Sequence, residues 1–163
     1  MVELTLVGVR VELPSNQPIV LLKERDGDRF LPIWIGAVEA TAIAFALQGV
    51  VTQRPMTHDL IKSILDEVGI TVDLVEITEL REGTFYASIR LRSNGTSYEV
   101  TSRPSDAIAL AVRSGTPIFA AEEVLDEASI PLREEGTEEP EESQVQKFRE
   151  FLDQVTPEDF LNQ

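Results

Sequence analysis

The chain has 163 residues, contains no cysteine and carries a formal net charge of −15. That length fits one domain with a sizeable core, plus a tail. Without cysteine, disulfides, thiol catalysis and thiolate metal sites are excluded, and the composition fits a reducing cytosol. The charge is uneven, because residues 122–163 hold 14 acidic and 3 basic side chains. This balance argues against a nucleic-acid binder that relies on bulk positive charge, but it leaves room for a small site with local arginines.

The N-terminal segment lacks the basic stretch and apolar core of a signal peptide. No apolar run in the sequence is long enough to span a bilayer. We therefore expect a cytoplasmic protein that has no membrane partner.

The N-terminal part of the chain predicts a strand followed by a hairpin. Residues 2–13 alternate between apolar and polar side chains as a half-buried strand does, with Gly8 as a candidate bulge. Asp-Gly at 26–27 is a strong hairpin signal between two further strands, 18–24 and 29–35. This turn makes Glu24 face Arg29, so opposite charges pair across the hairpin.

Two helices are expected after this hairpin. Residues 37–48 are apolar almost all round, which predicts burial on most sides. Trp34, just before them in an alternating strand, is interpreted as a core residue. Residues 57–68 carry one apolar stripe, so this second helix is expected to cover the core from outside. The stripe consists of Leu60, Ile61, Ile64, Leu65 and Val68.

Strands dominate the next part of the chain. Asn-Gly at 94–95 predicts a second hairpin, and a nearly all-apolar helix is expected from Asp106 to Ser114. The expected strands are residues 70–80, 84–92, 97–102 and 117–121. Runs of strands broken by helices predict the α+β class. The sheet should be mixed and largely antiparallel, with two buried helices, one amphipathic helix and a C-terminal helical tail.

The composition divides the chain into three parts. Residues 1–132 form the predicted domain, residues 133–143 an acidic linker, and residues 144–163 a C-terminal amphipathic helix. A short helix with an apolar stripe is marginal alone in water, so we expect it to dock on its own domain or on another subunit. A homo-oligomer such as a dimer would follow from the second arrangement.

Two short stretches look alike and carry the most specific chemistry. They read Arg-Pro-Met-Thr-His-Asp at 54–59 and Arg-Pro-Ser-Asp at 103–106. Each offers an arginine, a hydroxyl residue suited to cap a helix, and an aspartate just inside that helix. A guanidinium, a carboxylate and unpaired backbone N–H groups at one helix start can hold a phosphate or a metal ion.

Three carboxylates sit at predicted helix starts: Glu39, Asp59 and Asp106. Each could simply interact favourably with the positive helix end. If the three starts converge, the carboxylates would form an all-oxygen site for Mg²⁺ or Mn²⁺ that activates water.

The other candidate site residues carry nitrogen or a hydroxyl group. His58, the only histidine, could be a general acid or base near a phosphate, or a hydrogen-bonded structural residue. Arg54 and Arg103 could each grip a phosphate, with Ser105 beside them, or could pair with carboxylates and hold loops together.

Three motifs together resemble one known family. They are L-P-I-W-I-G-A-V-E-A at 31–40, R-P-M-T-H-D-L at 54–60, and R-P-S-D-A-I-A-L-A-V-R at 103–113, the last followed by P-I-F from Pro117. The chain resembles the bifunctional nuclease domain proteins over roughly its first 128 residues. That family is described as having DNase and RNase activity. The resemblance implies a nuclease that hydrolyses phosphodiester bonds with nucleic acid as partner.

The predicted function is therefore metal-assisted phosphodiester hydrolysis. Glu39, Asp59 and Asp106 would bind Mg²⁺ or Mn²⁺ or activate water. His58 would assist proton transfer, and the two arginines would hold phosphate. The alternative is a non-catalytic regulatory domain that uses the same polar residues to bind a small anion or a protein partner. The acidic charge favours this alternative.

Overall fold

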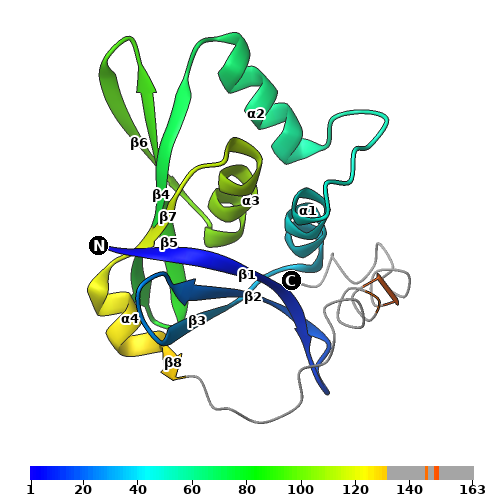
Figure 1. Cartoon of the computed structure of the whole chain (residues 1–163), viewed down its shortest axis with the longest axis vertical. Coiled ribbons are helices and arrows are strands. Elements are labelled where there is room, and N and C mark those ends of the chain that lie inside the picture. Colours follow the sequence, from blue (N-terminus) through cyan, green and yellow to red (C-terminus); the bar gives the residue numbers. More distant parts are fainter. Residues whose placement is uncertain (132–145, 147–148, 151–163) are drawn as a thin grey trace.

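A computed structural model describes residues 1–131, 146, 149 and 150 of the chain (Figure 1). The predicted linker at 133–143 lies outside the described residues. Of the predicted C-terminal helix, only Gln146, Arg149 and Glu150 are described, and all three are helical.

One mixed sheet organises the described chain. Its strand order is β6-β5-β4-β7-β1-β2-β3-β8, and every neighbouring pair is antiparallel except β4 and β7. This arrangement confirms the predicted α+β class and the largely antiparallel sheet. The strands are β1 (Val2–Glu12), β2 (Gln17–Glu24), β3 (Arg29–Trp34), β4 (Thr71–Arg81), β5 (Thr84–Ser93), β6 (Thr96–Ser102), β7 (Ile118–Ala120) and β8 (Ile130–Pro131).

The predicted hairpins have the expected register. In the first, Arg29 Nε lies 2.9 Å from Glu24 Oε2. In the second, Arg90 is the partner of Glu99 across β5 and β6. The register of β1 against β2 shifts at Gly8, whose φ of 156° few other residues adopt, so the predicted bulge is confirmed.

Four helices accompany the sheet in the described chain: α1 (Ala37–Leu47), α2 (Thr57–Glu67), α3 (Pro104–Ser114) and α4 (Glu122–Ala128). Helix α3 packs against β4 and β5, and both α1 and α2 pack against α3 (Figure 1). This layering makes α3 the central helix, and its side chains at Ala107, Ile108 and Ala109 are fully buried. Residues that start or end the three helices are thereby brought close together.

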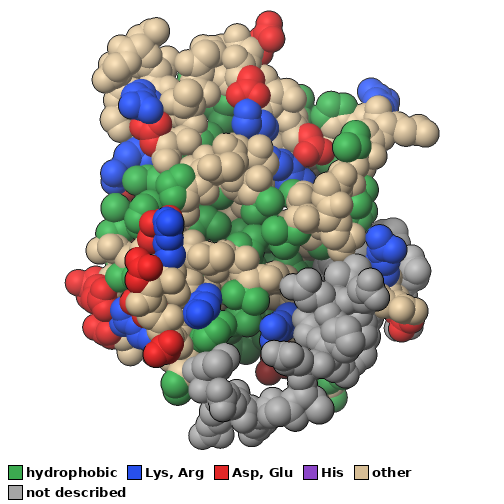
Figure 2. Space-filling view, viewed as in Figure 1, with side chains coloured by type: hydrophobic (Ala, Val, Ile, Leu, Met, Phe, Trp, Pro, Cys, Tyr) green, Lys and Arg blue, Asp and Glu red, His purple; other side chains and the backbone are tan. Residues whose placement is uncertain are grey.

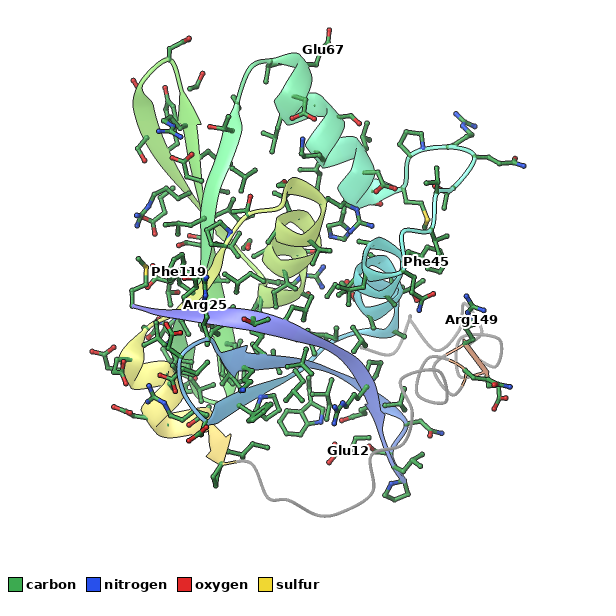
Figure 3. All side chains as sticks on the ribbon, viewed as in Figure 1. Glu12, Arg25, Phe45, Glu67, Phe119 and Arg149 are labelled. Atoms are coloured by element: carbon green, nitrogen blue, oxygen red, sulfur yellow. The ribbon has the colours of Figure 1, made fainter. Side chains whose placement is uncertain are left out.

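The burial of α1 and α2 differs from the prediction. Helix α1 is buried on one side only, and Val38 on its other side is 53% exposed. Along α2, Leu65 packs against the core, but most of the apolar stripe faces outward. Leu60, Ile61, Ile64 and Val68 are all exposed. The reason is that α2 lies on α3 at the margin of the fold, where its final residue Glu67 extends away from the body (Figure 3).

Trp34 is not a core residue, which makes its interpretation from the sequence wrong. Its indole ring is about half exposed, and its Nε1 donates a hydrogen bond of 2.8 Å to Glu12 Oε2. Strand alternation explains the error, because Leu31 and Ile33 occupy the buried face of β3 and leave Trp34 on the other face.

Helix α4 and strand β8 were not predicted. Helix α4 is only seven residues long and largely acidic, so its sequence resembles a solvated loop. Acidic side chains gather over this helix at the left edge of the molecule in Figure 2. Arg29 fixes this helix to the first hairpin by ion pairs with Glu122 at 2.7 Å and Asp126 at 3.0 Å. Within the described part of the chain, none of these helices has the length and apolar character needed to cross a membrane.

Candidate functional site

The two similar motifs both begin helices, but not with the expected caps. The N-cap residues are Met56 and Arg103 rather than Thr57 and Ser105. Pro104 takes the first position of α3, which suits its fixed φ and missing N–H. The helix therefore starts two residues earlier than predicted. Asp59 and Asp106 consequently occupy equivalent third positions in their helices.

A chain of four side chains, here named the polar network, connects three helices. Arg103 Nη2 lies 2.8 Å from Glu39 Oε1, and Arg103 Nε lies 2.8 Å from Asp106 Oδ2. The second oxygen of Asp106 lies 2.9 Å from His58 Nε2. The network thus joins the first turns of α1, α2 and α3. It brings together four of the candidate site residues named from the sequence.

Burial within the polar network is graded. The side chain of His58 is 9% exposed, that of Asp106 is 30% exposed, and that of Arg103 is 65% exposed. The imidazole is therefore shielded by the helices, while the guanidinium faces solvent. An anion that approaches from solvent would meet Arg103 first.

Electrostatics keep Asp106 and Arg103 charged. Burial alone would raise the pKa of Asp106, but hydrogen bonds from Arg103 and His58 outweigh burial and lower that pKa below its ordinary value. The two carboxylates raise the pKa of Arg103, with the hydrogen bond to Asp106 as the largest cause. Asp106 therefore remains an ionised acceptor for the imidazole at neutral pH.

Asp59 belongs to a second interaction, the Asp59–Arg113 pair. Its Oδ1 accepts a hydrogen bond of 2.6 Å from Arg113 Nε, and its Oδ2 accepts one of 3.0 Å from the backbone N–H of Met56. The bond from Arg113 is the main cause of the lowered pKa of Asp59. Arg113 was not predicted as a site residue. The sequence feature that could have identified Arg113 is a basic side chain in the last turn of a mostly apolar helix.

The remaining predicted site residues lie apart from these contacts. Arg54 is exposed in the loop between α1 and α2, and no described residue forms an ion pair with its guanidinium. Thr52 Oγ1 donates a hydrogen bond of 2.6 Å to the backbone carbonyl of Arg54. Ser105 is buried, at 5% exposure, so its hydroxyl does not face solvent.

The three carboxylates do not form one oxygen cage. Glu39 and Asp106 both bind the guanidinium of Arg103, whereas Asp59 binds that of Arg113. Across residues 1–131 and the three described residues of the C-terminal helix, no group of three or more Asp, Glu or His side chains is placed to hold a metal ion. In this arrangement, arginine side chains occupy the places where a cation would bind.

Acid is expected to weaken the fold through Asp59 and Asp106. Both carboxyls have a pKa below the ordinary 3.8 in the folded protein, so each stabilises the fold above that pH. Their contribution should be lost as the pH falls below 3.8 and through the folded values. Urea unfolding at neutral and acidic pH would measure it. The double variant Asp59→Asn, Asp106→Asn should lose less stability in acid than the wild type, and an equal loss would contradict this assignment.

Comparisons with known proteins bear on the same region. A family model described as the bifunctional nuclease domain matches residues 20–133, which contain both the polar network and the Asp59–Arg113 pair. Uncharacterized proteins of two Mycobacterium tuberculosis strains, CDC 1551 / Oshkosh and ATCC 25618 / H37Rv, are each 48% identical over 162 residues, 97% of either chain.

Plant proteins are similar over a shorter region. Bifunctional nuclease 1 of Arabidopsis thaliana is 33% identical over 108 residues, which cover 64% of this chain and 33% of the plant protein. Bifunctional nuclease 2 of Oryza sativa subsp. japonica is 32% identical over 115 residues, or 68% and 35% of the two chains. The chain thus matches about a third of the length of these plant relatives.

Proposed function

Because the chain belongs to the bifunctional nuclease domain family, we propose that it hydrolyses phosphodiester bonds of DNA, RNA or both. The observation that carries this proposal is the contact of 2.9 Å between His58 Nε2 and Asp106 Oδ1 in a shielded position beside a solvent-facing arginine. A base held by a carboxylate and placed near a cationic anchor suits proton transfer at a phosphate.

Each member of the polar network has a role in this proposal. Asp106 accepts a hydrogen bond from the N–H group at Nε2 of His58, which leaves Nδ1 as the unprotonated nitrogen that takes a proton from attacking water. Arg103 binds carboxylates through Nε and Nη2, and no described residue accepts a hydrogen bond from its Nη1, so Nη1 is the group that would meet a phosphate oxygen. Glu39 holds the guanidinium from the α1 side. Exposed Arg54 adds a second cationic contact for the nucleic-acid backbone.

Metal assistance is a separate part of the proposal. Glu39 and Asp106 converge on Arg103, so Mg²⁺ or Mn²⁺ would bind there only if the guanidinium moved aside. Asp59 would in addition have to leave Arg113. The proton transfer described above does not depend on these rearrangements.

The alternative is an anion- or protein-binding regulatory domain without catalysis. The observation that favours it is that all three carboxylates form ion pairs with arginines, which is also how purely architectural networks are built. Self-association is compatible with either function. The exposed apolar side chains of α2 support a dimer that buries them, and light scattering on the purified protein would measure its mass.

The function is tested with purified full-length protein and end-labelled single-stranded DNA and RNA. We expect cleavage in fractions that follow the protein peak, measured separately with Mg²⁺, with Mn²⁺ and with EDTA. Cleavage that persists in EDTA would place the chemistry in the side chains, whereas cleavage restored only by a metal would support a cation site. Tight binding of the oligonucleotide without cleavage under every condition would favour the regulatory alternative.

A further inference from the structure

Arg113 occupies a position where three helices meet. Its side chain is only 10% exposed although it stands in the last turn of α3. The guanidinium donates to Asp59 Oδ1 on α2 at 2.6 Å, to the carbonyl of Ala42 on α1 at 2.9 Å and to the carbonyl of Ala109 on its own helix at 2.8 Å. One planar group therefore connects α1, α2 and α3.

The contact with Asp59 is the one that reaches the site. Asp59 is the chain neighbour of His58, and both lie in the first turn of α2. Apart from His58, no residue of α2 is buried, so few apolar contacts fix the start of this helix. The Asp59–Arg113 pair and the contact between His58 and Asp106 are the two charged or polar links between α2 and α3 among the described residues.

We propose that Arg113 is the positioning residue of the site, which holds the start of α2 so that the imidazole of His58 meets Asp106. This inference rests on the proposed function for its catalytic consequence, but not for its structural one. Arg113 itself need not touch substrate. Its effect on the reaction is transmitted through Asp59 and the backbone of α2 to His58.

Arginine is required for this task because of its geometry. The three acceptors lie on three different helices, and a planar fork with five N–H groups reaches all of them. Lysine has the same charge but a single ammonium on a flexible stem. Arg113→Lys should therefore keep the attraction to Asp59 without restoring the fixed orientation of α2.

The chain offers a direct measurement, because His58 is its only histidine. In ¹H–¹⁵N NMR spectra, the ring resonances of His58 therefore need not be distinguished from those of other histidines. In Arg113→Gln, Arg113→Lys and Asp59→Asn we expect these ring resonances to shift or broaden relative to the wild type. In nuclease assays of the same variants, kcat should fall about 100-fold, as for a misplaced catalytic group, with KM nearly unchanged.

Arg29→Gln is the matched control. Arg29 also joins separate elements through ion pairs, with Glu24, Glu122 and Asp126, but it binds α4 rather than the helices of the site. This variant should lose stability while the His58 resonances and kcat stay as in the wild type. If Arg113→Gln fails to fold, Asp59→Asn removes the charge partner while leaving the bonds from Arg113 to the two carbonyls in place.

Two results separate the inference from the proposed function. Folded Arg113→Gln and Asp59→Asn with wild-type His58 resonances would overturn the positioning role, whatever the nuclease assay gives. Altered resonances in a protein that cleaves no nucleic acid would support the positioning role and overturn the proposed function alone.

Discussion

Replacement of Asp106 by Asn is expected to lower nuclease activity by a factor of about 10² to 10⁴, the usual contribution of general acid–base catalysis. Asn keeps the size of the side chain but removes the charge that Arg103 and His58 share. The amide can also turn its NH₂ group toward the imidazole, which favours the wrong tautomer of His58. The measurement is kcat on single-stranded substrate under the conditions that give most cleavage with the wild type.

Asp73→Asn is the control for this loss. Asp73 accepts a hydrogen bond of 2.9 Å from Arg92 on the sheet, so its replacement breaks another aspartate–arginine pair outside the polar network. Its kcat should equal that of the wild type. Both variants should remain folded and unfold cooperatively on heating, with Asp106→Asn at a lower midpoint because it loses the ion pair with Arg103. Full activity in folded Asp106→Asn would exclude the polar network as the catalytic site.

Truncation of Leu125 to Ala should lower the free energy of unfolding by about 2–5 kcal/mol, which is more than we expect for any of the site variants. Leu125 is fully buried in α4 and belongs to the same core cluster as Ile108 and Val75. The lost side chain would leave a cavity that helices and sheet fill only in part. Urea unfolding followed by circular dichroism measures the change.

Leu47→Ala provides the comparison at an exposed position. Leu47 also lies in a helix, but it is 45% exposed, so the same truncation should cost well under half as much. Equal losses in the two variants would mean that α4 does not dock on the core in solution. A large loss confined to Leu125→Ala would place α4 within the folded domain.

Local signals in the sequence predicted the sheet well. Asp-Gly at 26–27 and Asn-Gly at 94–95 specify tight turns, and a tight turn fixes which residues face each other. Predictions about helix burial were less accurate, because they depend on which neighbour a helix meets. The stripe of α2 is correct as a pattern, yet α3 provides a partner for only one edge of it.

For the candidate site as well, local sequence motifs predicted the helix starts but not the contacts between helices. The arginine–aspartate motifs indicated helix starts that carry charge, and four of the residues named from them and from the first turn of α1 do meet. The pairing within the cluster was not predictable. Whether Asp59 would bind Arg103 or Arg113 depends on how α2 is rotated on α3, and neither sequence motif encodes that rotation.

The short strand β7 joins two halves of the sheet, β1 to β3 and β4 to β6. Strands β1 to β3 and strands β4 to β6 are each joined by local turns, so each group can form from contacts close in sequence. Only the three residues of β7 connect the groups, antiparallel to β1 and parallel to β4, and they come after both groups in the chain. Closure of such a distant connection carries a loop-entropy cost that local hairpins avoid. We therefore expect the two halves to join late in folding. Helix α3 directly precedes β7, so Asp106 and Arg113 should reach their partners in the same step.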